Sequence, residues 1–446
     1  MRRYLLVVPE FPPEELGGGG VVYKELALRY ADLGELLVIT GGWSGRFRTP
    51  SLEMISERCL LLRLPVIANR WDIPAMRSTL PPTPSGRRLL NLIIRAWNPG
   101  VAHLHGIGYL LVDGSARLLT ALGIPYILTN HGMPISYRWG KQRMLKQFAY
   151  NIYTELFARK TIEGASRITA VSDVEASKLD YARVIPNGIA IVPDFEIKPP
   201  TYSGFEFVDN EDETPMVLSC GRLVPNKGFH VLLDALQQIR LPLRCVIAGA
   251  DGGELARLKD MAIRLEPAIK IIFSGSLLRG ELAWLMRKAS LVVIPSISEP
   301  FGLVAFEALG MGTRIVATDT GGMGEWLQDP TLPVSRAVPG NTTSLADCIR
   351  SALELGPPTP QELHAVRDLL EVLSWEKIAT QYLDLLNGLY SERLEFQEPG
   401  WWSRLGIASY RNVRRATPIP PMRLNGLHAV SVIDRLVKSS FSEDQF

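Results

Sequence analysis

Short apolar runs alternate along this chain with longer segments in which apolar residues recur every three or four positions. In the first part of the chain the apolar runs are YLLVV (4–8), LLVIT (36–40), VAHLH (101–105), YILTN (126–130) and RITAVS (167–172). The segments between them include KELALRYADLG and ARLLTALG, and each of these ends in glycine, as helices often do. Strands that alternate with helices predict an α/β domain built on a parallel sheet.

The same alternation starts again near residue 213, with the runs MVLSCG, LRCVIAGA, IKIIFSG, LVVIPS and RIVATDT. Because a chain of 446 residues is too long for one hydrophobic core, the two series predict two domains. A segment rich in proline and acidic residues separates them. The predicted parts are an N-terminal domain 1–192, a linker 193–215, a C-terminal domain 216–374, a helix 375–396 and a basic, aromatic tail 397–446.

Composition narrows the class of protein. Apolar residues make up 46% and charged residues 21%, which is typical of a globular chain. A net charge of +2 provides no general attraction for nucleic acid, so we expect no nucleic-acid partner. No apolar run reaches the length of about 18 residues that a membrane span needs, and prolines interrupt the N-terminal apolar run too early for a signal peptide. The cysteines are scattered without a C-x-x-C pair, which favours reduced thiols and a cytoplasmic location: Cys59, Cys220, Cys245 and Cys348.

The segment SISEPFGLVAFEALGMG (296–312) holds two carboxylates separated by seven residues, Glu299 and Glu307. The apolar run before it, Leu291–Ile294, predicts a buried parallel strand, and the Pro-Phe-Gly turn then starts a short helix. Glu299 is therefore expected on the loop at the carboxyl end of a strand, where doubly wound sheets bind ligands, and Glu307 in the following helix. The helix start would turn free amides towards an anion, those near Gly302, Leu303 and Val304.

This segment resembles the E-x7-E motif of retaining glycosyltransferases of the GT-B type, in the family 4 (group 1) class that uses nucleotide sugars. The resemblance implies two Rossmann-like, doubly wound parallel-sheet domains that face a cleft, with a C-terminal helix that crosses back to the first domain. It implies that Glu299 contacts the hydroxyls of the donor sugar and that Glu307 holds the ribose hydroxyls of the nucleotide. It also implies that the amides after Gly302 receive the sugar or the diphosphate.

A second motif, SCGRLVPNKGFHVLLDAL, opens the C-terminal domain with two cations, Arg222 and Lys227, on a loop between a strand and a helix that starts near Phe229. Cations above a helix N-terminus favour a diphosphate, which arginine can bind with two hydrogen bonds, although solvated loop cations are the alternative. The run resembles the arginine and lysine motif of the same family. The resemblance implies that both cations neutralise charge on the leaving nucleotide.

Four glycines, Gly17 to Gly20, precede the first predicted helix of the chain. Eight residues separate Val8 from Gly17, so the spacing excludes the G-x-G-x-x-G turn of a dehydrogenase, which follows its strand directly. Gly17 and Gly18 match the paired glycines that in the resembled family approach the donor phosphate, and a flexible tetraglycine loop is the alternative. The run TGGMGEW (320–326) also resembles a family run whose glycines approach the phosphates.

His131 follows a predicted strand in the run TNHGMP, at the carboxyl edge of the first sheet. A buried structural histidine is one interpretation, but the run resembles a T-x-H-G motif of the family, which implies contact with the donor sugar rather than general-base catalysis. His103 and His105 have H-x-H spacing and point to the same side of a strand. Without a third ligand nearby we expect them to line the cleft rather than to hold a metal.

The sequence thus predicts an enzyme that moves a sugar from a nucleotide diphosphate sugar to a hydroxyl of a glycan, glycolipid or polysaccharide precursor, with retention and without a cofactor or metal. The family mechanism implies that the acceptor hydroxyl attacks on the face from which the nucleotide leaves and that the leaving phosphate takes the proton. Two alternatives are a nucleotide-sugar-binding protein without turnover and a nucleotide-sugar epimerase of the same architecture.

Two basic, aromatic segments predict contact with an anionic membrane surface on its cytoplasmic face, and a lipid-linked acceptor would suit such a location. One segment starts near Tyr137 and continues as an apolar helix face to Leu156. The other is the tail, in which Trp401 to Leu424 contain two tryptophans, five arginines and no acidic residue. The alternative is that the first segment packs on the core and the tail docks on the protein or stays disordered.

Overall fold

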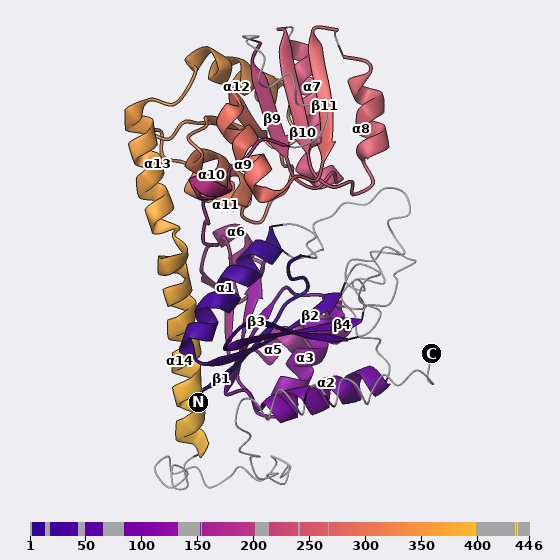
Figure 1. Cartoon of the computed structure of the whole chain (residues 1–446), viewed down its shortest axis with the longest axis vertical. Helices are drawn as coiled ribbons and strands as arrows, with labels where there is room; N and C mark the ends of the chain where they lie inside the picture. The colour runs from indigo at the N-terminus through magenta and orange to yellow at the C-terminus, as the bar shows by residue number, and fades with distance from the viewer. Residues whose placement is uncertain are drawn as a thin grey trace. The chain divides into compact units, whose positions relative to one another are not determined.

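A computed structural model of the chain describes residues 2–13, 18–42, 50–65, 84–132, 152, 154–200, 214–239, 241–265, 267–397, 433 and 435. The chain forms two compact units, each built around one sheet (Figure 1). Unit 1 comprises Met1–Thr169, Tyr181–Arg183 and Ala379–Phe446. Unit 2 comprises Ala170–Asp180 and Val184–Ile378.

The sheet of unit 1 has the strand order β3-β4-β2-β1-β5-β6-β7-β8. Its strands are β1 Arg3–Val7, β2 Glu35–Gly42, β3 Ser51–Ser56, β4 Cys59–Pro65, β5 Val101–His105, β6 Tyr126–Asn130, β7 Arg167–Ala170 and β8 Arg183–Val184. In this spatial order each pair of neighbours from β4 through β2, β1 and β5 to β6 is parallel. Five of these strands, β1, β2, β5, β6 and β7, lie where the apolar runs predicted them.

The hairpin of β3 and β4, which forms one edge of the sheet, was not predicted from the sequence. The two strands pair antiparallel, and Leu61 and Leu62 of β4 are fully buried. The apolar run CLLLRLP was a signal for β4, but its partner SLEMIS lacks a continuous apolar run. Pairing with β4 therefore decides the conformation of β3, which local propensity does not indicate.

Helices cover both faces of the sheet of unit 1, with α1 on one face and α2 and α3 on the other (Figure 1). The elements of unit 1 that are not strands include α1 Gly19–Leu33, α2 Pro84–Trp97, α3 Leu110–Ala121, a π-helical turn Thr154–Ala158 and α5 Arg159–Glu163. In α1 the buried side chains recur on one stripe, for example Tyr23, Ala27 and Tyr30, which fixes the face that packs on the sheet.

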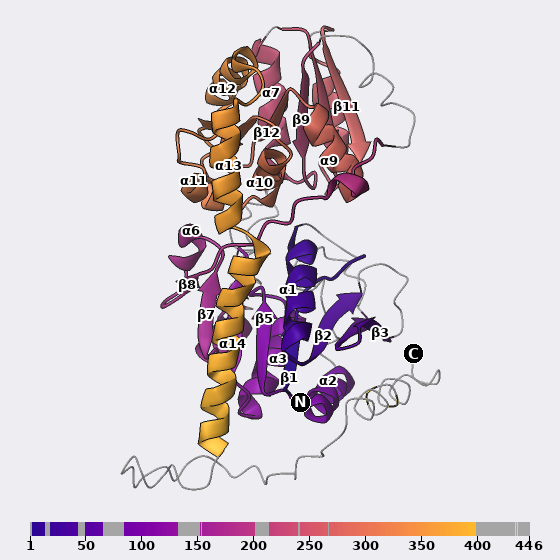
Figure 2. The same ribbon diagram turned by 60° about the vertical axis from the view of Figure 1, so that its left-hand side comes forward.

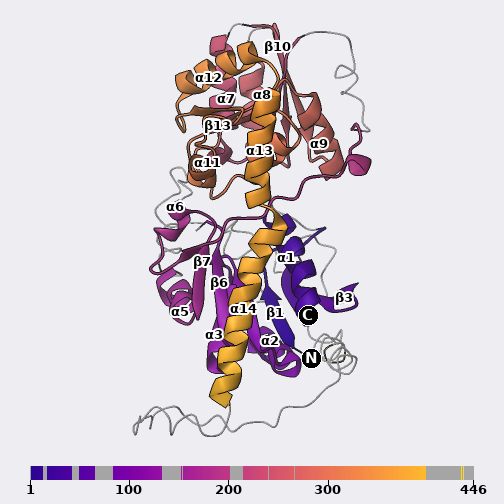
Figure 3. The same cartoon turned by 90° about the vertical axis from the view of Figure 1, so that its left-hand side faces the viewer.

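The last long helix, α14 (Trp375–Gln397), belongs to unit 1 from Ala379 onward. It packs on the sheet of that unit, over β1 and β5, as Figures 2 and 3 show. The ring of Tyr390 lies 5.8 Å from that of Tyr4, and the Arg393 guanidinium donates to the carbonyl oxygen of Gly100 at 2.9 Å. The C-terminal helix therefore returns to the first domain, as the resemblance implied.

The sheet of unit 2 has six strands, and each pair of neighbours is parallel. Its order is β11-β10-β9-β12-β13-β14, which is the 3-2-1-4-5-6 order of a doubly wound fold. The strands are β9 Met216–Cys220, β10 Leu243–Ala248, β11 Ile269–Gly275, β12 Leu291–Ile294, β13 Ile315–Thr318 and β14 Val334–Ala337. The helices include α6 Asp173–Ala176, α7 Phe229–Ile239, α8 Leu255–Ala262, α9 Arg279–Lys288, α10 Leu303–Gly310, α11 Gly321–Trp326, α12 Thr342–Leu355 and α13 Pro360–Val372.

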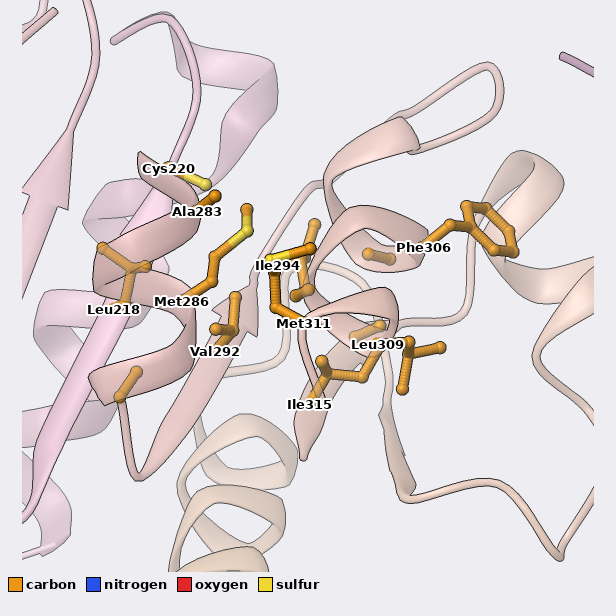
Figure 4. Close-up of a cluster of buried hydrophobic side chains, with 14 of the residues drawn as sticks. Leu218, Cys220, Ala283, Met286, Val292, Ile294, Phe306, Leu309, Met311 and Ile315 are labelled. Atoms are coloured by element: carbon orange, nitrogen blue, oxygen red, sulfur yellow. The ribbon is translucent and has the colours of Figure 1, made fainter. Parts of the chain in front are cut away.

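Two apolar clusters fill the two faces of this sheet, because successive side chains of a strand point to opposite sides. Leu218, Val292 and Ile315 pack with α9 and α10, as Figure 4 shows. Val217 and Val293 join the cluster under α7 and α12 on the opposite face. Strands that are apolar at every position are therefore buried on both sides, which is typical of parallel sheets.

Several sequence predictions concern residues outside those that the structure describes. These are Gly17, the segment from Tyr137 to Lys146, the acidic part of the linker and nearly all of the tail 397–446. Among the helices that the structure does describe, none is long and apolar enough to cross a membrane.

Candidate functional site

Two loops of unit 2 meet because the order of its strands reverses between β9 and β12. The strands on either side of this point are neighbours in the sheet, so the loops that follow them start side by side. The loop after β9 carries Arg222 and Lys227, and the loop after β12 carries Glu299. The topology thus brings together two motifs that lie about 70 residues apart in the chain.

An ion pair joins the two loops. The Lys227 Nζ lies 2.5 Å from the Glu299 Oε2, and the Ser296 hydroxyl donates to the same oxygen at 3.3 Å. The side chains of Lys227 and Glu299 are 24% and 13% exposed, so the pair is partly shielded from water but reachable from solvent. A partly shielded lysine of this kind can exchange its carboxylate partner for another anion.

Asn226, next to Lys227, fastens the loops to each other. Its carbonyl oxygen accepts hydrogen bonds from the amides of Ile297 at 2.8 Å and Ser298 at 3.4 Å. Its side-chain Nδ2 donates to the carbonyl oxygen of Ser298 at 3.3 Å. The positions of Lys227 and Glu299 are therefore held by backbone contacts and not only by their own attraction.

Two glycines permit the close packing around Glu299. Gly321 has φ +53°, and a Cβ there would lie 1.7 Å from the carbonyl oxygen of Glu299. Gly302 has φ +91° at the N-cap of α10, and a Cβ there would lie 2.4 Å from the Met323 Cγ. Leu303 and Val304 form the first turn of α10, as the sequence predicted.

Glu307 lies in the second turn of α10 and borders a small concavity that opens to solvent. Its walls are mostly apolar and include Met286 and Met311. Burial raises the pKa of Glu307, and the nearby positive charge of Arg279 opposes this effect. Arg279 also borders the concavity and donates to the carbonyl oxygen of Ala190.

Sequence reasoning missed Arg279. Its only signal was its position at the start of a helix that follows a strand, after the run IKIIFSG. The side chain of Arg222, which the sequence did predict for the site, has an unsatisfied nitrogen. Its Nε is buried and has no hydrogen-bond partner among the described residues. A buried guanidinium nitrogen usually has an acceptor, so this atom fits a site that an anionic ligand completes.

In unit 1 the side chains of His105 and His131 form a hydrogen-bonded pair at the carboxyl ends of β5 and β6. The His105 Nδ1 lies 2.7 Å from the His131 Nε2, and the two rings stack at a centroid distance of 5.0 Å. The Tyr23 ring of α1 contacts both, at centroid distances of 5.0 Å and 5.5 Å. His131 is half-buried, and burial lowers its pKa to about 4, so the side chain is neutral at pH 7.

His103 is fully buried and fully hydrogen-bonded. Its Nδ1 lies 2.7 Å from the Tyr30 hydroxyl, and its Nε2 lies 2.6 Å from the Thr129 hydroxyl. His105 is also fully buried. The expectation that these two histidines line the cleft is therefore wrong: both are buried, and alternation places them on the covered face of β5, under α1 and α14.

The start of α1 already holds a carboxylate. Gly18 is the N-cap of α1, and the Glu10 Oε1 accepts a hydrogen bond from the Gly20 amide at 3.1 Å. Glu10 is only 6% exposed, and a negative charge at this end of a helix is stabilised by the helix dipole. Sequence reasoning did not single out Glu10, because the loop PEFPPEEL does not indicate which of its three glutamates turns inward.

Among the described residues no group of three or more His, Cys, Asp or Glu side chains could hold a metal ion. Burial raises the pKa of Cys220 to about 12, with a further contribution from the negative charge of Glu307. Cys220 thus remains a neutral thiol at the end of β9, beneath the loop of Arg222 and Lys227. The charges of the site in unit 2 come from arginine, lysine and glutamate side chains.

Comparison with known families agrees with this arrangement. Residues 16–193 match the model of "Glycosyltransferase Family 4", and residues 205–365 match that of "Glycosyl transferases group 1". Together the two models cover most of both units, in the order that the fold requires. The chain therefore belongs to the glycosyltransferases that these two models describe, and it is an enzyme. Its two doubly wound units have the GT-B fold.

Individual relatives extend over different parts of the chain. An uncharacterized glycosyltransferase of Methanocaldococcus jannaschii is 33% identical over 178 residues, which is 39% of this chain and 45% of that protein. Glycogen synthase of Mycobacterium tuberculosis is 26% identical over 85% of this chain and 92% of its own length. The structure of Anabaena HepE in complex with UDP and glucose matches with a TM-score of 0.61 and 19% identity, over 87% of this chain and all of that one.

Proposed function

We propose that the enzyme transfers a sugar, with retention of anomeric configuration, from a nucleotide diphosphate sugar to an acceptor hydroxyl of a glycan or a lipid-linked precursor. The observation that carries this proposal is the meeting of Lys227 and Glu299 at the switch point of a doubly wound sheet, on the loop that also carries Arg222, whose buried Nε has no partner among the described residues. Two cations and an acid at that edge suit a ligand that combines a diphosphate with a polyhydroxylated sugar. The complex of Anabaena HepE with UDP and glucose supports the same class of donor.

In the proposed complex the donor separates the Lys227–Glu299 pair. The diphosphate oxygens take the place of the Glu299 carboxylate beside Lys227 and accept hydrogen bonds from Arg222. The released carboxylate of Glu299 then accepts hydrogen bonds from the hydroxyls of the donor sugar. Donor binding thereby converts a closed ion pair into two separate contacts with the ligand.

During transfer a bond forms between the acceptor oxygen and the anomeric carbon while the bond from that carbon to the diphosphate oxygen breaks. The proton of the acceptor hydroxyl passes to the leaving phosphate, on the same face of the sugar. Arg222, Lys227 and the α10 amides near Gly302, Leu303 and Val304 stabilise the negative charge that develops there. Since these groups supply the positive charge, we propose that transfer proceeds without a metal ion or another cofactor.

The other predicted residues have binding roles in this proposal. Glu307 holds the ribose hydroxyls of the nucleotide, and its position at the apolar concavity supports this role. His131 contacts the donor sugar as a neutral hydrogen-bonding group. Gly17 and Gly18 let the backbone approach the donor, although the carboxylate of Glu10 at the start of α1 favours contact with hydroxyls over contact with phosphate there.

A panel of nucleotide sugars tests the proposed function. The purified protein is incubated with each donor and candidate acceptors, and nucleotide release and the product anomer are measured by NMR. Transfer with retention is the expected result. Binding of a donor without release would instead indicate a binding protein, and a new sugar epimer on the nucleotide would indicate an epimerase; either result would overturn the proposal.

We further propose that the enzyme acts in the cytoplasm at an anionic membrane surface. The outer face of α2 supports this location: Arg87, Arg88 and Arg95 are exposed there together with Leu92, and the helix contains no acidic residue. Basic residues near an anionic surface contribute about 1 kcal/mol each. The basic tail 397–446 would add to this attraction.

Vesicle co-sedimentation tests the membrane proposal, with anionic and neutral vesicles compared at low and high salt. We expect binding to anionic vesicles alone, weakened by salt and by the triple variant R87E/R88E/R95E. The matched control is R264E/K270E/R367E, which changes three exposed cations of unit 2 and the net charge equally. Equal loss in both variants, or no binding at low salt, would contradict a role for α2.

A further inference from the structure

The hydrogen bond between His105 and His131 requires that one ring donate and the other accept. If His131 donates from Nε2, His105 accepts at Nδ1 and must carry its own proton on Nε2. That Nε2 is buried and has no hydrogen-bond partner among the described residues. A buried N–H without an acceptor is rarer in folded proteins than an acceptor that lacks a donor. The surroundings therefore favour the other tautomer, in which His105 donates from Nδ1.

We infer that His105 is a positioning residue, which donates from Nδ1 to the Nε2 of His131 and so fixes His131 as an Nδ1–H donor towards the substrate. With its Nε2 occupied, a neutral His131 carries its proton on Nδ1. The stacked rings and the Tyr23 ring hold the same orientation. This inference rests on the proposed function, because it assigns the donor-sugar contact of His131 to one nitrogen of the ring.

The charge state of the pair is set by the groups packed around it. Burial and the neighbouring His103 and His131 hold the pKa of His105 well below its usual value. Burial raises the pKa of Tyr23, and the nearby Glu10 and Tyr109 raise it further, so its phenol is neutral; burial keeps the phenol of Tyr382 in α14 neutral as well. Glu10 is the single carboxylate that the described residues bring to this set, and its Oε1 accepts a hydrogen bond from the Gly20 amide. The pair thus acts as a neutral donor–acceptor chain at pH 7.

Three substitutions of His105 separate this role from simple packing. Leu fills the space but cannot donate. Asn can place its amide N–H near the position of the lost Nδ1, whereas Gln extends its amide towards the position of Nε2. The control is H103L, which removes an equally buried histidine two residues earlier, whose ring nitrogens bond the Tyr30 and Thr129 hydroxyls instead of His131.

The first measurement is the tautomer of His131 from two-bond ¹H–¹⁵N spectra of histidine-labelled protein. The chain has only six histidines, so variants assign the signals. We expect the Nδ1–H form in wild type, H105N and H103L, and a shift towards the Nε2–H form in H105L and H105Q. The Nε2–H form in wild type, or an unchanged spectrum in H105L that is folded by circular dichroism, would overturn the inference.

The second measurement is turnover with the best donor of the nucleotide-sugar panel. Loss of a residue that orients a functional group typically lowers activity by about 10- to 100-fold. We expect such a fall in kcat for H105L, with the KM for the donor within about twofold of wild type, and substantial recovery in H105N. Turnover of H105L near the wild-type level would refute the inference. If no donor is turned over at all, the proposed function fails, while the His131 spectra still decide the role of His105.

Discussion

The substitution Gly321→Ala tests how closely the backbone must pack around Glu299. At φ +53° an alanine is strained by about 1–2 kcal/mol, whatever the space around it. Its Cβ would also lie 1.7 Å from the carbonyl oxygen of Glu299 and 2.9 Å from that of Pro300. To relieve this overlap the Glu299 backbone must move by roughly 1 Å or more. Overpacking of this kind lowers the stability by a further amount of about 1–3 kcal/mol.

Gly340→Ala is the matched control. Gly340 lies in the same unit with φ +72°, and a Cβ there would meet nothing within 4 Å. We therefore expect the control to lose about 1–2 kcal/mol of stability from backbone strain alone, and Gly321→Ala to lose about 2–5 kcal/mol. The stability of unit 2 is measured by urea denaturation with a probe that follows its near-UV signal, and the difference in midpoint between the two variants isolates the steric part.

Activity provides the sharper comparison. A misplacement of about 1 Å near a reacting centre can lower turnover by roughly 100-fold. We expect Gly321→Ala to show a fall of that order in kcat/KM under conditions in which it is folded, and Gly340→Ala to retain wild-type activity. If the two variants lost the same stability and both kept full activity, the contact between Gly321 and the Glu299 carbonyl would have no part in the site.

Three further results are expected. Arg222→Ala and Lys227→Ala should each lower kcat by about 100-fold, because both side chains stabilise the negative charge on the leaving phosphate. Glu307→Ala should chiefly raise the Kd for the nucleotide, which calorimetry measures. Turnover should survive excess EDTA, and loss that magnesium or manganese restores would argue against charge neutralisation by side chains alone. Since the folded protein holds His103 and His105 with lowered pKa values, their contribution to stability should be complete above about pH 6.5 and be lost as the pH falls below it, by at most about 1.4 kcal/mol per pH unit for each. H103L should flatten this slope in denaturation experiments at pH 5 to 7, and an unchanged slope would refute the assignment.

The sequence by itself determined the elements that carry the site. Leu291–Ile294 is apolar at every position, which predicts an internal strand, and the Pro-Phe-Gly turn that follows predicts its end; the structure buries all four residues. Glu299 and Glu307 therefore fell on a loop and on the following helix, as the structure confirms. Arg222 and Lys227 likewise lie between β9 and α7, as the pattern predicted. These are local consequences of periodicity and turn chemistry, which need no knowledge of distant residues.

Only the tertiary structure decided which of these elements are neighbours. The order of strands places β9 beside β12, and this pairing brings Lys227 to within 2.5 Å of Glu299. In the same way the pairing of β5 with β6 joins His105 to His131. Sequence periodicity specifies the face of a strand on which a side chain lies, but not the strand that pairs with it, because pairing depends on the packing of the whole sheet.

The residues that sequence reasoning missed have the same physical origin. Glu10 turns inward because the start of α1 offers it a free amide, and Arg279 joins Glu307 because α9 packs beside α10. His103 and His105 were expected to line the cleft, but α1 and α14 cover their side of β5. The sequence specifies which functional group each side chain carries. Its partner and its access to water depend on elements that lie far away along the chain and come together only on folding.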